Sequence, residues 1–113
     1  MKKIALALLI FTGGLGVARA GGSLDQVNVY PNPYRLSLGH SRILFDNLTT
    51  QFKLRIYSAS GVLVREVEMD NSSGPYRWDV RNAAGEPIAS GIYVYIVTNN
   101  LGDKKSGKIA VIR

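Results

Sequence analysis

Hydrophobic and polar residues alternate along this chain in short runs that predict β-strands. The clearest run covers 52–58, where Phe52, Leu54 and Ile56 share one face and Lys53, Arg55 and Tyr57 the other. This is the period of a half-buried strand. Turn-forming residues separate the runs, and about seven short strands at this spacing predict an all-β antiparallel sandwich. The other expected strands are 27–30, 42–48, 62–68, 76–79, 92–98 and 108–112.

The alternation is imperfect in the run 62–68. Val64 and Val67 are three residues apart, so both can face inward only if a β-bulge interrupts the pairing. The preceding strand-like run, 27–30, stops at Pro31, because proline has no N–H to donate to a ladder. We therefore expect a bulge in the first case and a strand end in the second.

The only tryptophan of the chain, Trp78, lies two residues after Tyr76, so both side chains point to one face of a short strand. Two packed sheets lie about 10 Å apart, and a large aromatic side chain can fill that space. We expect Trp78 to pack against the aliphatic row of the strand 92–98, with Tyr93 and Tyr95 covering the opposite face. The expected core includes Leu54, Ile56, Trp78, Ile92, Val94 and Ile96.

An alternative interpretation exposes Tyr76 and Trp78, together with Tyr93 or Tyr95, as a platform that stacks on sugar rings. We favour the core interpretation, because a small domain without cysteine needs its one tryptophan for packing. The segment from Asp79 to Gly91 then connects two strands. There Asp79 and Asn82 can accept hydrogen bonds from turn N–H groups, and Gly85 and Gly91 can adopt positive φ.

The first twenty residues have the layout of a secretory signal peptide. Lys2 and Lys3 precede an apolar run, 4–11, and small residues end the segment at Ala20. That run is shorter than the roughly 20 residues needed to cross a bilayer. We therefore expect a cleavable signal helix at 1–20, a flexible lead-in at 21–26 and one domain at 27–113, which is not an integral membrane protein after cleavage. A retained N-terminal anchor is the alternative.

Composition and charge narrow the possible functions. Part of the formal net charge of +6 lies in the signal segment, and the rest needs no nucleic-acid partner to explain it. The single histidine, His40, has no cysteine and no G-x-S-x-G serine to activate. The acidic turns 70–74 and 79–86 suggest calcium, but they lack EF-hand spacing and consist of ordinary turn residues. We expect no enzyme activity, catalytic residue, metal site or cofactor.

Several motifs resemble one known group of domains. Their order and spacing are similar to those of the C-terminal sorting domains of the type IX secretion system, and of the related immunoglobulin-like domain of flagellar hook-capping proteins. The segments concerned are "VYPNPYR", "KLRIYSASGVLVREV", "YRWDVRNAAGEPIASGIYVYIV" and "GKIAVIR", which lie within Val27 to Arg113. The matching motif residues are Pro31, Asn32, Pro33, Gly91, Tyr93 and Gly107.

This resemblance implies an immunoglobulin-like (fibronectin-III-like) sandwich without catalytic activity, recognised by outer-membrane secretion machinery or by neighbouring protein chains. We also expect no small-molecule substrate, and no nucleic-acid partner, because aromatic residues are not interleaved with the basic residues near the end of the chain. We expect export through the inner membrane to the periplasm, the outer-membrane surface or the medium. The final strand would offer an open edge for pairing. Its expected polar contacts are Lys104, Lys105, Lys108 and Arg113.

Two questions stay open at this point: whether the chain is part of a longer protein, and whether its function is other than sorting. Sorting domains usually end a larger cargo protein, and no cargo separates the expected signal peptide from the domain here. The chain could therefore be a fragment of a longer secreted protein or a free-standing module. A structural or assembly module like the hook-capping domain is the second function considered, and a small carbohydrate-binding module is the third.

Overall fold

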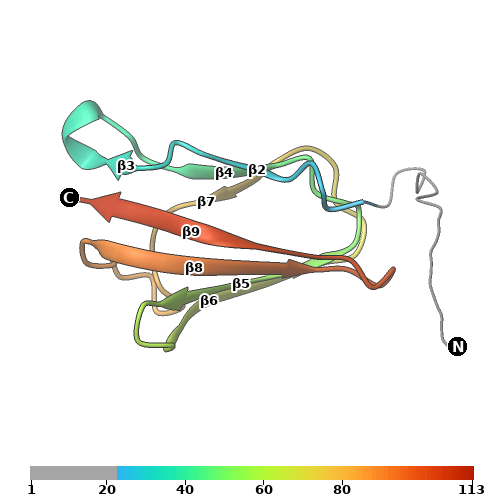
Figure 1. Ribbon diagram of the computed structural model, residues 1–113. Coiled ribbons are helices and arrows are strands. Elements are labelled where there is room, and N and C mark those ends of the chain that lie inside the picture. Colours follow the sequence, from blue (N-terminus) through green and yellow to red (C-terminus); the bar gives the residue numbers. More distant parts are fainter. Residues whose placement is uncertain (1–22) are drawn as a thin grey trace, which may run out of the picture.

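The computed structural model describes residues 23–113, and it consists of two β-sheets packed face to face (Figure 1). The expected signal peptide, 1–20, lies outside the described residues. The smaller sheet is antiparallel and has the strand order β2–β4–β7. Its strands are β2 (Asn28–Tyr30), β4 (Ile43–Asp46) and β7 (Tyr76–Trp78).

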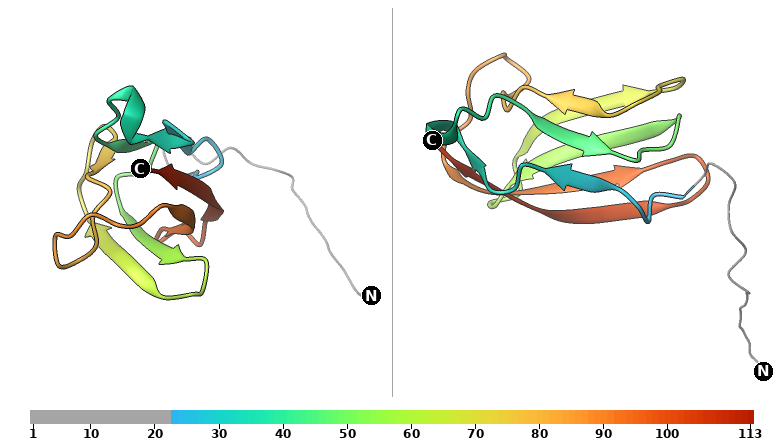
Figure 2. Two further views of the ribbon diagram at one scale, coloured as in Figure 1. Left: turned by 90° about the vertical axis from the view of Figure 1, so that its left-hand side faces the viewer. Right: turned by 90° about the horizontal axis from the view of Figure 1, so that it is seen from above.

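The larger sheet has five strands in the order β3–β9–β8–β5–β6, so the last strand of the chain is not at its edge. Its pairs are antiparallel except β3 with β9, which run parallel over two residues. The two layers are seen from further directions in Figure 2. The strands are β3 (Tyr34–Arg35), β5 (Phe52–Ser58), β6 (Leu63–Met69), β8 (Gly91–Thr98) and β9 (Lys104–Ile112). The expected all-β immunoglobulin-like sandwich is confirmed.

Two short elements were not expected from the sequence. They are β3 and the single 3-10 turn η1 (Leu36–Leu38) that follows it. The last strand also begins at Lys104 rather than at Lys108, because Thr98 still pairs with Lys104 across the hairpin. Only a tight turn remains between the two strands, and the side chain of Asn99 accepts hydrogen bonds from the N–H groups of Leu101 and Asp103.

The irregularity expected in the run 62–68 is present. The pairing of β5 with β6 shifts between Ile56, which pairs with Arg65, and Tyr57, which pairs with Leu63. Val64 is thus the extra residue of a bulge. Val64 and Val67 are both partly buried and pack against the core, so the bulge allows two valines at odd spacing to contact the same interior.

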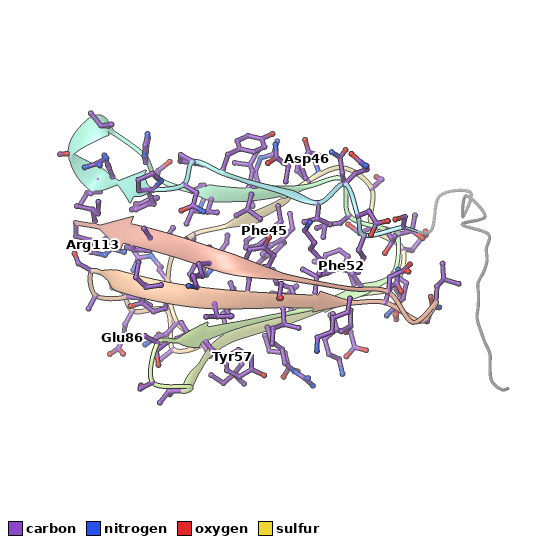
Figure 3. All side chains as sticks on the ribbon, in the orientation of Figure 1. Phe45, Asp46, Phe52, Tyr57, Glu86 and Arg113 are labelled. Carbon is purple, nitrogen blue, oxygen red and sulfur yellow. The ribbon has the colours of Figure 1, made fainter. Side chains whose placement is uncertain are left out.

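The core lies between the sheets, and Trp78 is fully buried in it with Leu54 and Ile56. The indole Nε1–H of Trp78 donates to the backbone oxygen of Arg81 at 3.0 Å, which satisfies the one polar group of this side chain. Figure 3 shows Phe45 and Phe52 between the layers, whereas Tyr57 lies on the outside of the larger sheet.

The expectation for β8 was wrong about which face is buried. Ile92 is 47% exposed, and Val94 and Ile96 are only partly buried. The buried row consists instead of Tyr93, Tyr95 and Val97. The pairing register requires this, since Leu54 and Ile56 of the core lie opposite Val97 and Tyr95. Facing residues on paired strands point to the same side of a sheet, so the aliphatic row of β8 faces outward.

The packed domain begins before Val27, where the lead-in was expected to end. Leu24 is fully buried in the core, and its backbone oxygen accepts a hydrogen bond from Val27 N at 3.2 Å. A short segment of the expected lead-in therefore belongs to the sandwich. Among residues 23–113 we find no helix with the length and apolar character needed to span a membrane.

Candidate functional site

Asn32 connects the Pro31-Asn32-Pro33 element to the last strand. Its side-chain nitrogen donates to the backbone oxygen of Lys108 at 2.8 Å, and its side-chain oxygen accepts from Ala110 N at 3.0 Å. The flanking prolines have no N–H to offer, so the amide of Asn32 takes the place of a peptide group beside β9. The sequence marked this element as a motif but did not reveal its partner, which is 76 residues away.

The edge of β9 that faces Asn32 is only partly occupied. Along a strand, the N–H and C=O groups of alternate residues point to the same edge. Since Lys108 C=O and Ala110 N–H point toward Asn32, the backbone groups of Lys104 and Ser106 point to this edge as well. Within the described residues, β3 pairs with β9 only at Val111 and Ile112. The first half of β9 is therefore open to an added strand.

The four cationic residues expected to form the recognition surface do not lie together. Lys104 and Lys108 are exposed on the outer face of the large sheet, on the side opposite the buried Ile109 and Val111. Lys105 points to the other face, because its position in the strand is offset by one residue. Lys104 and Lys108 make no ion pair within residues 23–113.

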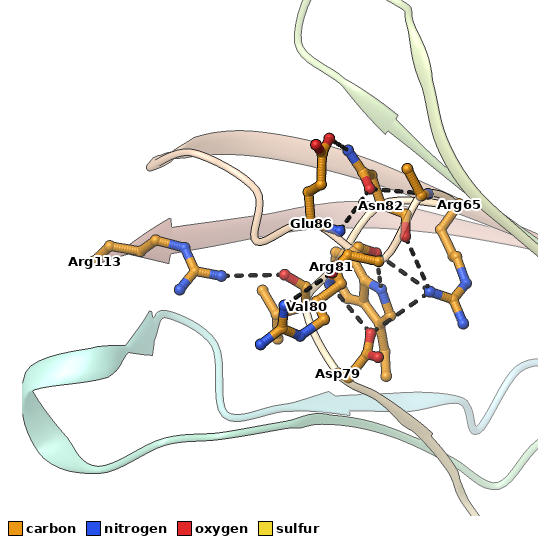
Figure 4. A network of polar contacts seen from close by, with 10 residues as sticks. Arg65, Asp79, Val80, Arg81, Asn82, Glu86 and Arg113 are labelled. Carbon is orange, nitrogen blue, oxygen red and sulfur yellow. Dashed lines mark hydrogen bonds and ion pairs between the residues drawn. The ribbon is translucent and has the colours of Figure 1, made fainter.

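Arg113 is held by the domain itself. Its Nε donates to Ile88 O, its Nη2 donates to Val80 O at 3.1 Å, and its backbone N donates to the hydroxyl of Ser90 at 2.9 Å. The guanidinium carbon also lies 5.9 Å from the ring centre of Tyr34. In Figure 4 the Arg113 side chain extends toward Val80 in the connection between β7 and β8. These contacts assign Arg113 a role in closing one end of the sandwich.

The aliphatic row of β8 borders the two exposed lysines. Val94 pairs with Lys108 on one side and Tyr57 on the other, and Ile92 pairs with Ala110. Cross-strand neighbours have Cβ atoms about 5 Å apart, so these side chains form one continuous surface. We name it the outer face: Tyr57, Ile92, Val94, Ile96, Lys104 and Lys108.

One ion pair also belongs to this side of the sheet. Arg55 Nε donates to Glu66 Oε2 at 2.8 Å. The hydrogen bond from Arg55 lowers the pKa of Glu66, and the same bond raises the pKa of Arg55. Because Arg55 is paired within the domain, the cations that remain for a partner on this side of the sheet are Lys53 of β5 and the two lysines of β9.

The remaining motif residues support the packing of β8 and β9. Gly107 pairs with Tyr95, whose ring occupies the space where a Cβ of residue 107 would lie. Gly91 begins β8, and its φ is not positive, contrary to expectation. The hydroxyl of the buried Tyr93 donates to Ala89 O at 2.7 Å, just before the strand. These contacts give Gly107 and Tyr93 a structural role in the packing of β8 and β9.

The connection between β7 and β8 is organised as the sequence indicated. Asp79 Oδ1 accepts from Arg81 N, and Asn82 Oδ1 accepts from the N–H groups of Ala84 and Glu86. Gly85 has a φ of 81°. Asp79 Oδ1 and Asn82 Oδ1, which were considered as calcium ligands, thus accept from backbone N–H groups, and Glu86 Oε1 accepts from Asn82 Nδ2 at 3.2 Å.

A sugar-stacking platform is not formed by these aromatic residues. Trp78, Tyr93 and Tyr95 are all buried, and Tyr76 is partly buried against the core. Burial raises the pKa of the Tyr76 and Tyr95 hydroxyls above the ordinary tyrosine value. An interior position of Tyr95 also follows from its edge-on contact with Phe45, with ring centres 5.5 Å apart.

PorZ and PorU are among the solved structures that share this fold. PorZ, an essential surface component of the type IX secretion system of Porphyromonas gingivalis, is 30% identical with a TM-score of 0.68. The match covers 80% of this chain and 12% of PorZ. Dimeric latent PorU of the same organism is 24% identical with a TM-score of 0.54, and the match covers 76% of this chain and 9% of PorU. The chain thus spans a small part of either protein.

The family comparison covers most of the sandwich. No curated protein matches the chain. Residues 39–103, more than half of the chain, match the model of the FlgD Ig-like domain. This range extends from the loop before β4 to the turn before β9, so it includes Trp78 and the whole of β8. The chain belongs to the FlgD Ig-like domain family.

Proposed function

We propose that this protein is a non-enzymatic, exported β-sandwich module of the sorting-domain type, recognised by type IX secretion machinery at the bacterial envelope. The similarity to PorZ supports the association with this system. In this proposal the recognised surface is the outer face together with the open edge of β9.

One observation carries the proposal: a partly exposed aliphatic row lies beside two exposed lysines and beside backbone groups of β9 that pair with no other strand in residues 23–113. Isolated apolar residues are common on protein surfaces, whereas a contiguous apolar row on one sheet face indicates an interface. Ile92 and Val94 would supply apolar contact, and Lys104 and Lys108 would select a partner with acidic groups. An open strand edge adds main-chain hydrogen bonds of the kind used in β-strand addition.

A reporter fusion tests this proposal. Residues 21–113 are attached to a secreted reporter in a bacterium with type IX machinery, and the reporter exposed at the cell surface is measured. We expect surface display of the parent fusion and a severalfold decrease for Lys104→Gln/Lys108→Gln and for Ile92→Ser. Arg77→Gln, an exposed charge change on the smaller sheet, should display normally. Periplasmic retention of the parent fusion, or equal display by all variants, would contradict the proposal.

A second candidate function is a structural or assembly module, and the family membership favours it. In that case, neighbouring chains of this protein, and not secretion machinery, would bind the outer face and the open edge of β9. Analytical ultracentrifugation distinguishes the two functions. Defined oligomers that dissociate in Ile92→Ser would support assembly, whereas a monomer at high concentration would exclude it.

A further inference from the structure

A cavity of about 500 Å³ lies at one end of the sandwich, where residues around η1 meet the β7–β8 connection and the end of β9. Its lining includes Arg42, Arg81 and Arg113 and one acidic side chain, that of Asp79. Asp79 Oδ1 also lies 3.6 Å from Arg65 Nη1 and accepts a hydrogen bond from Arg81 N. Positive charge is therefore in excess among the side chains of this cavity, which we name the arginine cavity.

Two of the three guanidinium groups are fixed by backbone carbonyls. Arg113 donates to Ile88 O and Val80 O, and Arg81 Nη1 donates to Gly85 O at 2.9 Å. A guanidinium has five N–H donors, so each of these groups retains donors for a ligand. Arg42 makes no side-chain hydrogen bond or ion pair within residues 23–113. Figure 4 shows Arg81 and Arg113 reaching this region from the β7–β8 connection and from the end of β9.

His40 adds a neutral donor with a defined tautomer. Its Nδ1 accepts a hydrogen bond from Arg35 N at 2.9 Å, so the proton of the neutral ring is on Nε2. The ring is tilted against that of Tyr34, with centres 5.9 Å apart. Tyr34 and Pro87 supply less polar parts of the same wall.

We propose that the arginine cavity binds the phosphoryl group of a small phosphate monoester. Guanidinium groups match phosphate oxygens in geometry and charge, and three of them suit a dianion better than a single carboxylate. The volume leaves room for an organic group beside the phosphoryl group, next to Tyr34 and Pro87. This inference does not depend on the proposed function, because the cavity does not include the outer face.

Titrations of the purified protein followed by amide NMR test the proposal. The probes are inorganic phosphate, glucose 6-phosphate and glycerol 3-phosphate, with acetate and glucose as controls at constant ionic strength. We expect saturable shifts at residues of the arginine cavity with all three phosphates, and at least tenfold weaker binding of acetate. Tighter binding of glucose 6-phosphate indicates that the bound phosphoryl group belongs to a phosphorylated sugar. Tighter binding of glycerol 3-phosphate indicates that it belongs to a lipid headgroup.

Arg42→Gln is the decisive variant, because its side chain holds nothing else in the described structure. We expect at least tenfold weaker phosphate binding with an unchanged melting temperature. Arg77→Gln removes the same charge outside the cavity and should bind as the parent does. Shifts that do not saturate, that centre on the β9 lysines, or that are equal in Arg42→Gln and the parent would overturn the proposal. Equal affinity for acetate would overturn the choice of phosphate.

Discussion

The ring of Tyr95 lies directly over Gly107, its partner across the β8–β9 hairpin. A Cβ atom at position 107 would lie 2.6 Å from Cε2 of that ring and 2.7 Å from its hydroxyl oxygen. Gly107→Ala must therefore displace the ring or the strand, and we expect a loss of about 1–3 kcal/mol in the free energy of unfolding. Urea denaturation measures this loss.

A double-mutant cycle shows whether the ring is the cause. In the background of Tyr95→Ala, where the ring is absent, Gly107→Ala should cost much less than in the parent. Ser106→Ala, at the neighbouring exposed position, serves as the control and should change stability little. Equal costs of Gly107→Ala in both backgrounds would contradict the packing explanation.

Asn32 is predicted to stabilise the end of β9 through its two backbone hydrogen bonds. Asn32→Ala removes both and should cost about 1–2 kcal/mol. Asn32→Asp keeps an acceptor for Ala110 N but loses the donor to Lys108 O, so it should be destabilising as well. Asn28→Ala, which changes an exposed asparagine of β2, is the matched control.

Hydrogen exchange gives a local measure of the same contact. The amide of Ala110 should exchange faster in Asn32→Ala than in the parent, while amides in the β5–β8 ladder keep their protection. Unchanged exchange at Ala110 would show that the amide of Asn32 does not protect this edge.

The orientation of β8 can be tested with one substitution at two positions. Val97 is fully buried, whereas Val94 lies on the outer face. Val97→Thr places a hydroxyl in the core and should cost about 1–3 kcal/mol. Val94→Thr should cost less than about 1 kcal/mol. Thermal or urea unfolding measures both costs. A larger cost for Val94→Thr than for Val97→Thr would contradict the observed orientation and support the one expected from the sequence.

Stability should decrease at alkaline pH because of the buried tyrosines. Burial raises the pKa of Tyr95 and of Tyr76 in the folded state, so folding favours the neutral hydroxyl. This contribution is complete below the unfolded-state pKa of about 10, and it is lost as the pH rises through the folded-state pKa.

The measurement compares the free energy of unfolding of the parent and of Tyr95→Phe between pH 8 and about 11. Tyr95→Phe keeps the ring and removes the ionisable group, so its stability should fall less steeply above about pH 10. Identical slopes for the two proteins would show that Tyr95 does not contribute to the alkaline loss.

The sequence was sufficient to locate every strand except β3, but not to assign the buried face of each strand. The period-two run at 52–58, the bulge near Val64 and the end of β2 before Pro31 follow from local rules that act on neighbouring residues. The orientation of β8 could not be obtained in this way, because both of its faces are apolar. Its choice depends on pairing with β5 and on the space that Gly107 leaves for Tyr95.

The candidate sites were harder to predict for the same physical reason. The partner of Asn32 and the arginine cavity depend on contacts between residues far apart in the chain, and no local spacing indicates those contacts. The lysines of β9 were identified from their concentration near the end of the sequence and from the family resemblance, whereas the internal role of Arg113 needed the position of the β7–β8 connection. One usable signal was present: an asparagine between two prolines is the only residue of that element able to donate a hydrogen bond from its side chain.

The amide that Asn32 presents to β9 limits how far a foreign strand could extend along this domain. A strand from another protein could pair with Lys104 and Ser106. At Lys108, however, the backbone oxygen already accepts a hydrogen bond from Asn32. Pairing beyond Lys108 would require the added strand to displace the side chain of Asn32 and then β3. The domain itself thus limits the length of an added strand, which favours a short, reversible pairing over a continuous sheet shared by two proteins.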